Sequence, residues 1–416
     1  MMVFGEARRQ RLKMSYTNRS CFKAVLVLTL ISAYVILALV SNLGMLPIQA
    51  NLGSIKELQE SELNKRNYTI SIWKVGARMQ RRFLRSFGSI ERDPFAQCSV
   101  RNCRLEVNDS LVRFSDAVMF HLHLLRNIKT ALPKTRPINQ QWIFFTDESP
   151  YHTFMADPKL TMKDLNGLFN LSMTYRSDSD IPIPYGRTEK LPSPNLEDLT
   201  SMLKSKTKGV TILGSNCDGK NGRWDYVHEL AKYIQVDIFG RCGKQACPEH
   251  FSKDCDAIKD YQFYLSFENS NCAEYLTEKL WYNAYHKKAI PIVMGAPKDD
   301  YDRLCPPHSF IHIDDFASPK ELAEYIIKHK TNDKVGHVLH FRRLRKNPED
   351  LVAYHTWRRS YRVVNEHGYF GTPSLHLCRM CEMLNKPIKR QTLDHLESWW
   401  SVRRDCRNTR YKASTA

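Results

Sequence analysis

Residues 261–294 constrain the fold more than any other stretch, because a strand, a helix and a second strand follow one another there. Residues 261–267 alternate aromatic and smaller side chains, and residues 289–294 form the short apolar run that is typical of a buried parallel strand. Between them, one helical face carries four apolar side chains, Leu276, Leu280, Trp281 and Ala284. The spacing predicts a helix that begins near Tyr275 or Thr277, within an α/β fold.

Glu278 and Lys279 fall in the first turn of this helix, at the carboxyl-terminal edge of the predicted sheet. The unpaired N–H groups of a helix start attract anions, and open α/β sheets hold nucleotides at this edge. The pair therefore predicts a nucleotide site, with Glu268 and Asn269 at the end of the preceding strand. The alternative is an ordinary solvated helix start, in which both charges face water.

Further strand candidates lie on both sides of a proline-containing segment that follows Leu191. They are the apolar or β-rich residues 116–122, 141–145, 209–213, 236–239 and 310–313. A length of 416 residues with 42% apolar content allows about two domains with substantial cores. We predict an α/β half at residues 98–190, a linker at 191–204, a second half at 205–376 and a C-terminal segment at 377–416.

Three predictions concern the C-terminal part of the chain. The charged segment from Glu349 to Tyr369 predicts a peripheral helix, and a helix ending at Trp399 and Trp400 closes the fold. The basic tail after it is predicted to be mobile.

Glu148 stands on a loop just past the strand candidate at residues 141–145, in the sequence Thr-Asp-Glu-Ser-Pro. Pro150 biases Ser149 away from helical geometry, so the carboxylates are displayed beyond the strand end, where catalytic groups are common. Alternatively, Glu148 caps this turn and has no other role.

Residues 24–46 are a run of 23 residues without a charge, long enough for a helix to cross a bilayer. Six basic residues and one acidic residue precede the run, which favours a cytosolic N-terminus at residues 1–23 and a lumenal chain after the anchor. Residues 47–97 are polar and predict a stem. A cleaved signal peptide is the alternative, but the run is long for one and no small-residue cleavage site closes it.

Eleven of the twelve cysteines follow the predicted anchor, and a lumenal location makes disulfides the default. An odd number leaves at least one cysteine unpaired or bonded to another chain. Cys378 and Cys381 would suggest zinc or redox chemistry in the cytosol, but no second pair of ligands completes a zinc site. Cys242, Cys247 and Cys255 could pair locally. Three lumenal sequons predict N-glycosylation, at Asn67, Asn108 and Asn170.

The formal net charge of +18 raises the question of nucleic-acid binding. The basic residues are spread along the chain, however, and no nucleic-acid motif interrupts the α/β pattern, so we predict no nucleic-acid partner. A general positive field suits a ligand with a diphosphate, or an anionic membrane surface, equally well.

Two motifs together resemble the signature of the α1,3-fucosyltransferases of the glycosyltransferase family 10 type. One is Glu-Asn-Ser from Glu268, followed by Tyr-x-Thr-Glu-Lys from Tyr275 and Pro-Ile-Val-x-Gly from Pro291; the other is Trp-x5-Glu-Ser-Pro from Trp142. The resemblance covers most of residues 98–400. It implies a GT-B-type architecture with two Rossmann-like domains, and inverting transfer of L-fucose from GDP-β-L-fucose in α1,3 linkage to GlcNAc of N-glycans or related glycoconjugates.

The resemblance also implies roles for single residues. Glu148 is the implied general base, Arg223 and Lys279 contact the donor diphosphate, Glu278 bonds the ribose, and Tyr275 packs beside the donor, in the signature that includes Glu268 and Asn269. Cys98 and Cys103 would bond Cys378 and Cys381, in an order that stays open. The resemblance further implies a single-pass type II protein that is anchored in the Golgi membrane.

No metal is predicted to be essential, because Asp178-Ser179-Asp180 has the spacing of a metal motif but not its context at a strand end. Mn²⁺ could still raise activity. Two alternatives remain: a catalytically inactive relative that acts as a glycan-binding module, and a transferase that uses another donor or modifies protein. The acceptor also stays open, between the N-glycan core and distal LacNAc.

Overall fold

The computed structural model describes residues 66–79, 93–128, 131–243, 247, 254–329, 348–368, 374–387 and 391–412. Internal contacts separate residues 1–66 from residues 67–416, and the fold described below is that of the second unit. The predicted cytosolic tail and the anchor at residues 24–46 lie outside the described residues. Among the helices that are described, none combines the length and apolar character needed to span a bilayer.

The first sheet contains six strands in the order β2-β1-β3-β4-β5-β6, and every neighbouring pair is parallel. Phe120 lies opposite Phe144 where its two central strands pair, and both rings are fully buried. The strands are β1 (Tyr68–Ile72), β2 (Cys103–Glu106), β3 (Ala117–His121), β4 (Gln141–Thr146), β5 (Leu171–Thr174) and β6 (Ile181–Pro182). Two 3₁₀ turns accompany them, η2 (Asp109–Phe114) and η3 (Met162–Leu165).

The prediction of a stem throughout residues 47–97 is wrong, because strand β1 lies inside that range. All five of its residues are buried, since β1 pairs with β2 on one side and β3 on the other. A parallel strand in the interior of a sheet is covered on both faces. Ser71, a polar member of the strand, bonds the hydroxyl of Ser115 at 2.6 Å, which satisfies it in the core. The folded region therefore includes residues from Tyr68 onward.

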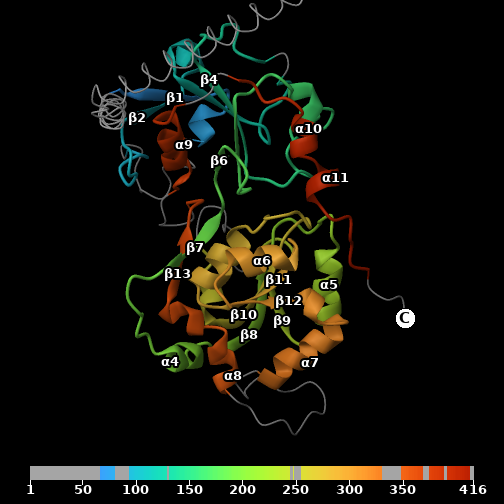
Figure 1. Ribbon diagram of the computed structural model, residues 1–416. Coiled ribbons are helices and arrows are strands. Elements are labelled where there is room, and N and C mark those ends of the chain that lie inside the picture. Colours follow the sequence, from blue (N-terminus) through green and yellow to red (C-terminus); the bar gives the residue numbers. More distant parts are fainter. Residues whose placement is uncertain are drawn as a thin grey trace, which may run out of the picture. The chain divides into compact units, whose positions relative to one another are not determined.

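The second sheet contains five parallel strands in the order β12-β11-β10-β8-β9, close to the positions that the apolar runs predict. They are β8 (Lys208–Leu213), β9 (Val236–Phe239), β10 (Tyr261–Phe267), β11 (Ile290–Met294) and β12 (Ile311–His312). Helices α5 (Arg223–Leu230) and α7 (Pro319–His329) lie side by side against it (Figure 1). Their apolar side chains share one core with the strands, including Val227, Leu322 and Phe263. Short elements complete this part: α4 (Leu199–Lys204), α6 (Lys298–Leu304), α8 (Pro348–Ala353), η4 (Asp256–Asp260), η6 (Ile313–Asp315) and η8 (Thr356–Arg359).

The helix between β10 and β11 is a π-helix, η5 (Lys279–His286), which begins later than the predicted Tyr275 or Thr277. Thr277 lies just before the helix: its carbonyl accepts from the N–H groups of Leu280 and Trp281, while its own N–H group and hydroxyl bond the carboxylate of Glu268. The predicted apolar face is correct from Leu280 onward, where Leu280, Trp281 and Ala284 are buried. The sequence pattern thus identified the buried face of the helix and, with Thr277, the place close to which it begins.

A two-stranded antiparallel sheet pairs β7 (Gly186–Lys190) with β13 (Tyr361–Asn365). The prediction of a helix throughout residues 349–369 is therefore wrong, because β13 falls within it. Val363 and Val364 favour extended geometry, and pairing with a strand distant in sequence decides the outcome. Residues 191–204, predicted as a linker, also include the helix α4.

The C-terminal helices α9 (His376–Leu384), α10 (Leu396–Trp399) and α11 (Val402–Asp405) lie beside the first sheet (Figure 1). Two disulfides, Cys98–Cys378 and Cys103–Cys381, attach α9 and give the pairing order that the sequence left open. The other described bridges are Cys217–Cys242, Cys247–Cys255 and Cys272–Cys406, and Cys305 is a free, buried thiol.

The predicted mobile tail is wrong as far as Lys412. Cys406 is bonded to Cys272, and the backbone N–H groups of Arg407 and Tyr411 bond the carbonyls of Asn271 and Asn221. The ring of Tyr411 also packs edge-on against Tyr226 on α5, with centroids 4.9 Å apart. A disulfide and aromatic packing therefore hold a segment whose charge alone indicated a solvated chain end.

We expect the two α9 disulfides to be redundant. Each bridge closes a loop of about 280 residues, for which the chain-entropy argument gives a stabilisation of about 5–6 kcal/mol. Once one bridge is formed, however, the other closes a loop of only about 10 residues and adds a stabilisation of only about 2–3 kcal/mol. Removing either pair as Cys→Ser should therefore lower the unfolding temperature modestly, and removing both should cost more than the sum.

Calorimetry on the two single-pair variants and the combined variant measures this. Removal of the local Cys247–Cys255 bridge is a matched control, since its closed loop is short. Strictly additive losses would contradict the redundancy, and free thiols at Cys98, Cys103, Cys378 and Cys381 in native protein would refute both bridges.

Candidate active site

Asp147 and Glu148, which follow β4, point in opposite directions. Asp147 is 4% exposed, and its two carboxylate oxygens lie 3.6 Å from Nε2 of His121 and 3.7 Å from Nε2 of His367. Glu148 is half-buried, and its Oε2 accepts a hydrogen bond of 2.9 Å from the hydroxyl of Tyr275. Successive side chains of an extended segment face opposite sides, which explains the divergence. Glu148 is therefore the carboxylate of the two that meets the second sheet's loops.

The pKa of Glu148 is raised above its ordinary value, first by burial and then by the charge of Asp147. The nearby His123, the hydrogen bond from Tyr275 and the charge of Lys279 act in the opposite direction. A carboxylate with a raised pKa is a better proton acceptor when it is ionised. Its environment thus suits a general base.

Lys279 is held by a carboxylate that belongs to the same signature. Its Nζ donates to Oε2 of Glu268 at 3.0 Å and to the hydroxyl of Thr277 at 2.8 Å. Burial lowers the pKa of Lys279, but the carboxylates of Glu268 and Glu278 outweigh it and the net shift is upward, so the ammonium stays charged. The site therefore presents a fixed positive charge at the start of η5.

Glu268 has no exposed surface, and its oxygens accept from the Thr277 N–H group, the Thr277 hydroxyl and Lys279. Prediction from the sequence placed it among the donor-binding residues. The structure places it beneath them instead, where it positions Lys279 and the chain before the helix. Glu278 is half-buried, with Oε1 3.4 Å from Nζ of Lys279, and keeps access to a ligand.

Arg223 is the first residue of α5, after Gly222, whose positive φ of 74° suits glycine. The guanidinium donates to the carbonyl of Phe267 at 3.0 Å and to the carbonyl of Asn216 at 2.7 Å. These bonds hold it at the carboxyl end of β10, near Lys279. Its Nε is buried and has no hydrogen-bond partner among the described residues. Arg223 and Lys279 thus form one positive region.

Two loops from different sheets meet at this place. The Ser270 hydroxyl lies 2.8 Å from the Ser149 hydroxyl and 3.1 Å from Oδ1 of Asn269. The Tyr275 ring is buried against Tyr175, with centroids 5.0 Å apart, so the hydroxyl that bonds Glu148 is rigidly placed. The structure therefore brings Glu148 together with the predicted donor residues.

The sequence analysis missed two histidines beside Glu148. Nδ1 of His123 lies 2.6 Å from the carbonyl of His152, and Nδ1 of His152 lies 3.3 Å from Oγ of Ser149. Burial, with smaller contributions from nearby groups that include His123 and Lys220, lowers the pKa of His152 to about 4, so its ring is neutral at physiological pH. His123 follows the end of β3, the neighbour of β4, and the strand-end rule that found Glu148 also applies to it.

Asp178 and Asp180, the pair with metal-motif spacing, are engaged by the protein. Asp178 pairs with Arg176, and Asp180 accepts from the N–H group of Ser172 at 2.8 Å and from its hydroxyl at 2.7 Å. Within the part of the chain that the structure describes, no group of three or more His, Cys, Asp or Glu side chains could hold a metal ion.

The three predicted glycosylation sites differ in their surroundings. Asn67 and Asn108 are exposed, as a glycan requires. Asn170 is half-buried; its Oδ1 accepts from the Trp142 N–H group at 2.9 Å and its Nδ2 donates to the Gln391 carbonyl at 3.1 Å. A glycan is attached through Nδ2, so attachment at Asn170 would compete with the bond from this atom to the Gln391 carbonyl.

Comparison with known proteins finds two family profiles, whose matched ranges divide between the two sheets. The profile "Fucosyltransferase, N-terminal" matches residues 65–186, and the profile "Glycosyltransferase family 10 (fucosyltransferase) C-term" matches residues 203–399. The first begins just before β1, which agrees with the corrected start of the folded region.

Curated relatives cover the same part of the chain. Glycoprotein 3-alpha-L-fucosyltransferase A of Drosophila melanogaster is 35% identical over 321 residues, which are 74% of this chain and 57% of that protein. The 3-galactosyl-N-acetylglucosaminide 4-alpha-L-fucosyltransferase FUT3 of Bos taurus is 35% identical over 72% of this chain and 74% of its own. Alpha-(1,3)-fucosyltransferase 7 of Rattus norvegicus is 32% identical over 75% of this chain and 76% of its own. With both family profiles matched and this identity sustained over most of its length, the chain belongs to glycosyltransferase family 10, the fucosyltransferases.

Proposed function

We propose that this protein transfers L-fucose from GDP-β-L-fucose in α1,3 linkage to a GlcNAc residue of a glycoprotein N-glycan or a related glycoconjugate. One observation carries the proposal: Glu148 from the first sheet is bonded to Tyr275 from the second, beside the positive region of Arg223 and Lys279. A base and a cationic leaving-group site thus lie close enough to act on one pair of substrates.

In this reaction the acceptor hydroxyl attacks the anomeric carbon of fucose from the face opposite GDP. A sugar hydroxyl is a weak nucleophile near neutral pH, and a base within hydrogen-bond reach contributes about 10²- to 10⁴-fold. Glu148 accepts the hydroxyl proton as the new C–O bond forms. A single displacement inverts the β-linked donor to an α-linked product and needs no covalent enzyme intermediate.

As the bond to GDP breaks, negative charge develops on the oxygen of its terminal phosphate. Lys279 and the N–H groups of Arg223 stabilise this charge, and Glu268 keeps Lys279 in place throughout. Glu278 bonds the ribose hydroxyls. Because these donors are fixed before the reaction, little reorganisation opposes charge development.

The proposal also includes the arrangement of the two domains and the location of the chain in the cell. The two parallel sheets correspond to the two Rossmann-like domains of a GT-B enzyme, with the substrates between the loops that carry Glu148 and Lys279. The apolar run at residues 24–46 anchors the protein in the Golgi membrane in type II orientation, with the catalytic region in the lumen.

Replacing Tyr275 with phenylalanine should move the acid limb of the pH–rate profile to higher pH. The base must be ionised, so transfer is lost as the pH falls through the pKa of Glu148, which burial and Asp147 already raise. The hydrogen bond from Tyr275 lowers that pKa, and its removal lets the pKa rise further.

Tyr175→Phe is the matched control, because this neighbouring hydroxyl is buried and has no hydrogen-bond partner among the described residues. Transfer rates measured as a function of pH for both variants decide the matter. An unmoved acid limb in Tyr275→Phe would contradict the assignment of Glu148 as the titrating base.

An acceptor panel with GDP-fucose, read by mass spectrometry with linkage analysis, tests the proposed function as a whole. The panel should contain the chitobiose core of N-glycans, LacNAc and a protein without glycans, and other sugar nucleotides should compete for the donor site. Fucose linked α1,3 to GlcNAc supports the proposal. Absence of transfer and of donor hydrolysis would indicate a binding module, and preference for another nucleotide would indicate a different donor.

A further inference from the structure

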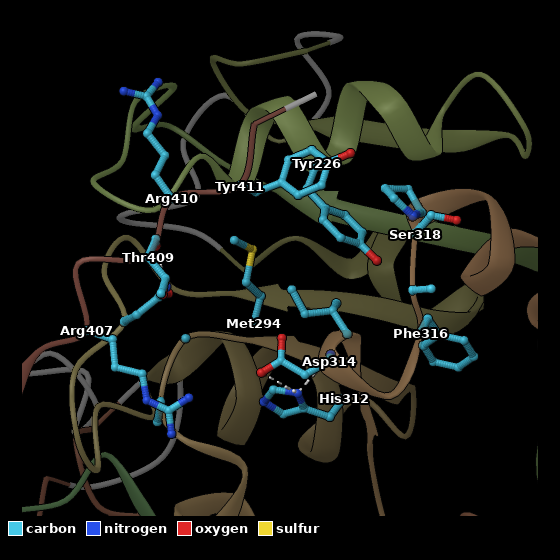
Figure 2. Close-up of a pocket in the computed structure, with 16 residues that line it drawn as sticks. Tyr226, Met294, His312, Asp314, Phe316, Ser318, Arg407, Thr409, Arg410 and Tyr411 are labelled. Atoms are coloured by element: carbon cyan, nitrogen blue, oxygen red, sulfur yellow. Dashed lines mark hydrogen bonds and ion pairs between the residues drawn. The ribbon is translucent and has the colours of Figure 1, made fainter. Parts of the chain in front are cut away.

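The cavity in Figure 2, which lies at the carboxyl ends of β11 and β12, belongs to the candidate active site. A Cβ added at Gly295, which lines the cavity, would meet the side chain of Glu268. One added at Gly222, directly before Arg223, would meet the backbone of Tyr411, which also lines it. The polar groups of this cavity are therefore part of the donor site.

The opposite edge of the second sheet, where its strands begin, carries a group of basic side chains that the donor site does not use. Lys206 lies between α4 and β8, and Lys288 lies between η5 and β11. His355 and Arg358 come from the segment after α8, which lies beside α4 (Figure 1). The charges that act on His355 are those of the other three residues, so the four lie together. We call them the basic cluster; Lys279, by contrast, follows the carboxyl end of β10.

His355 has a buried N–H group without an acceptor. Nε of Arg358 always carries a proton and donates it to Nδ1 of His355 at 3.3 Å, so Nδ1 is an acceptor. Burial, with smaller contributions from the three cations, holds the pKa of His355 well below its ordinary value, and the ring is neutral. The one proton of a neutral imidazole then lies on Nε2. This Nε2 is buried and bonds no described residue, whereas native proteins supply almost every buried donor with an acceptor.

Lys206 and Arg358 are cations that no described carboxylate bonds. Nζ of Lys206 donates to the carbonyls of Lys259 at 2.6 Å and Lys287 at 2.8 Å. The guanidinium of Arg358 donates to the carbonyl of Tyr285 at 2.7 Å. Burial, with smaller contributions from neighbouring cations, lowers the pKa of Lys206 to about 8, and burial lowers the pKa of Arg358 to about 10. Both groups are therefore charged near neutral pH.

The two carboxylates that act on these cations are paired with other lysines. Glu197 bonds Lys288, and Asp260 lies 3.1 Å from Nζ of Lys208. They reach Arg358 and Lys206 only through their charge. Buried charge without a partner is costly, so the basic cluster favours an anion.

We propose that the basic cluster binds one chloride ion, which accepts the hydrogen bond of His355 Nε2 and lies beside the charges of Lys206 and Arg358. A water molecule would accept the same hydrogen bond, but it would leave both charges uncompensated, whereas an anion supplies both needs. His355 is 1% exposed, so the site suits a single small ion rather than a nucleotide or a glycan. The inference does not rest on the proposed function.

Thermal unfolding of the full chain at constant ionic strength measures this binding, with sodium gluconate replaced stepwise by sodium chloride. Gluconate is too large for a buried site of one ion. A ligand that binds only the native state should raise the unfolding temperature by about 2 °C at a tenfold excess over its dissociation constant. Bromide should replace chloride, and its anomalous diffraction should give a peak within hydrogen-bond reach of His355 Nε2.

Variants of the basic cluster test the assignment. His355→Asn keeps an acceptor for Arg358 but has no group at the position of Nε2, and Lys206→Met keeps the length of the side chain without its charge. Each should weaken chloride binding at least about tenfold. His355→Gln can place an amide N–H group at the position of Nε2 and should retain part of the chloride dependence. Lys208→Met is the matched control, because this exposed lysine pairs with Asp260 and should leave the chloride dependence as in wild type.

Three outcomes would overturn the inference. The first is a wild-type unfolding temperature that is no higher in chloride than in gluconate. The second is a chloride dependence that His355→Asn and Lys206→Met retain in full, which would place the ion elsewhere. The third is a bromide peak without chloride-dependent stability, which would mean binding at crystal concentration only.

Discussion

Replacing Glu148 with glutamine should lower fucose transfer at least about 100-fold while leaving GDP-fucose binding intact. Glutamine keeps the size of the side chain and can still accept the hydrogen bond from Tyr275, but it cannot take the acceptor proton. The binding groups for the donor, Arg223 and Lys279, are untouched. Transfer rate and donor affinity, measured on the same preparation, separate the loss of chemistry from a loss of binding.

Asp147→Asn is the control for Glu148, because it changes the adjacent carboxylate. Asp147 is buried against His121 and His367, so its replacement should affect stability more than transfer. It should also move the acid limb of the pH–rate profile to lower pH, because the charge of Asp147 raises the pKa of Glu148. Near-normal transfer by Glu148→Gln, together with inactive Asp147→Asn, would transfer the catalytic role to Asp147.

Lys279→Ala should reduce turnover about 100- to 1,000-fold, which raises the activation free energy by about 2.7–4 kcal/mol. This is the typical effect of removing one preorganised hydrogen-bond donor from a developing negative charge. The loss should be greatest in the step where GDP departs, and GDP affinity should fall as well. Turnover, and GDP affinity by calorimetry, measure the two effects. Wild-type values for both in Lys279→Ala would show that the donor assignment is wrong.

This variant also leaves the carboxylate of Glu268 buried without its cation, and breaking a buried pair commonly destabilises a protein by about 3–5 kcal/mol. The double variant Glu268→Gln with Lys279→Ala removes that unpaired charge and serves as the control for folding. We expect the double variant to regain much of the thermal stability and none of the turnover. Recovery of turnover would mean that Lys279 acts only by stabilising the fold.

Local sequence patterns determined much of the second sheet. β8 to β12 lie close to the predicted runs, because buried parallel strands are apolar over their own length and need no distant partner to be recognised. The strand-end rule placed Glu148 and the first turn of a helix placed Lys279, for the same local reason. The resemblance in these two motifs identified the family, which the comparisons then confirmed.

Only the tertiary structure decided features that depend on residues far apart in the chain. The residues of β1 were assigned to the stem because they do not form a local apolar run. They are buried only because β1 pairs with β2 and β3, which follow later in the chain. The pairing order of Cys98 and Cys103 depends on where α9 packs, and the tail is held by Cys272. Charge and composition carry no information about such partners.

The same limit applies within the candidate site. The position past a strand end placed both Asp147 and Glu148 at the candidate site, but only the packing of His121 and His367 around Asp147 decided which carboxylate meets Tyr275. Glu268 was grouped with the ligand-binding residues because it shares their motif, and the structure buried it beneath Lys279. A motif indicates which residues act together. Which of them can reach a substrate depends on burial and on hydrogen-bond partners, and these are determined only when distant segments pack together.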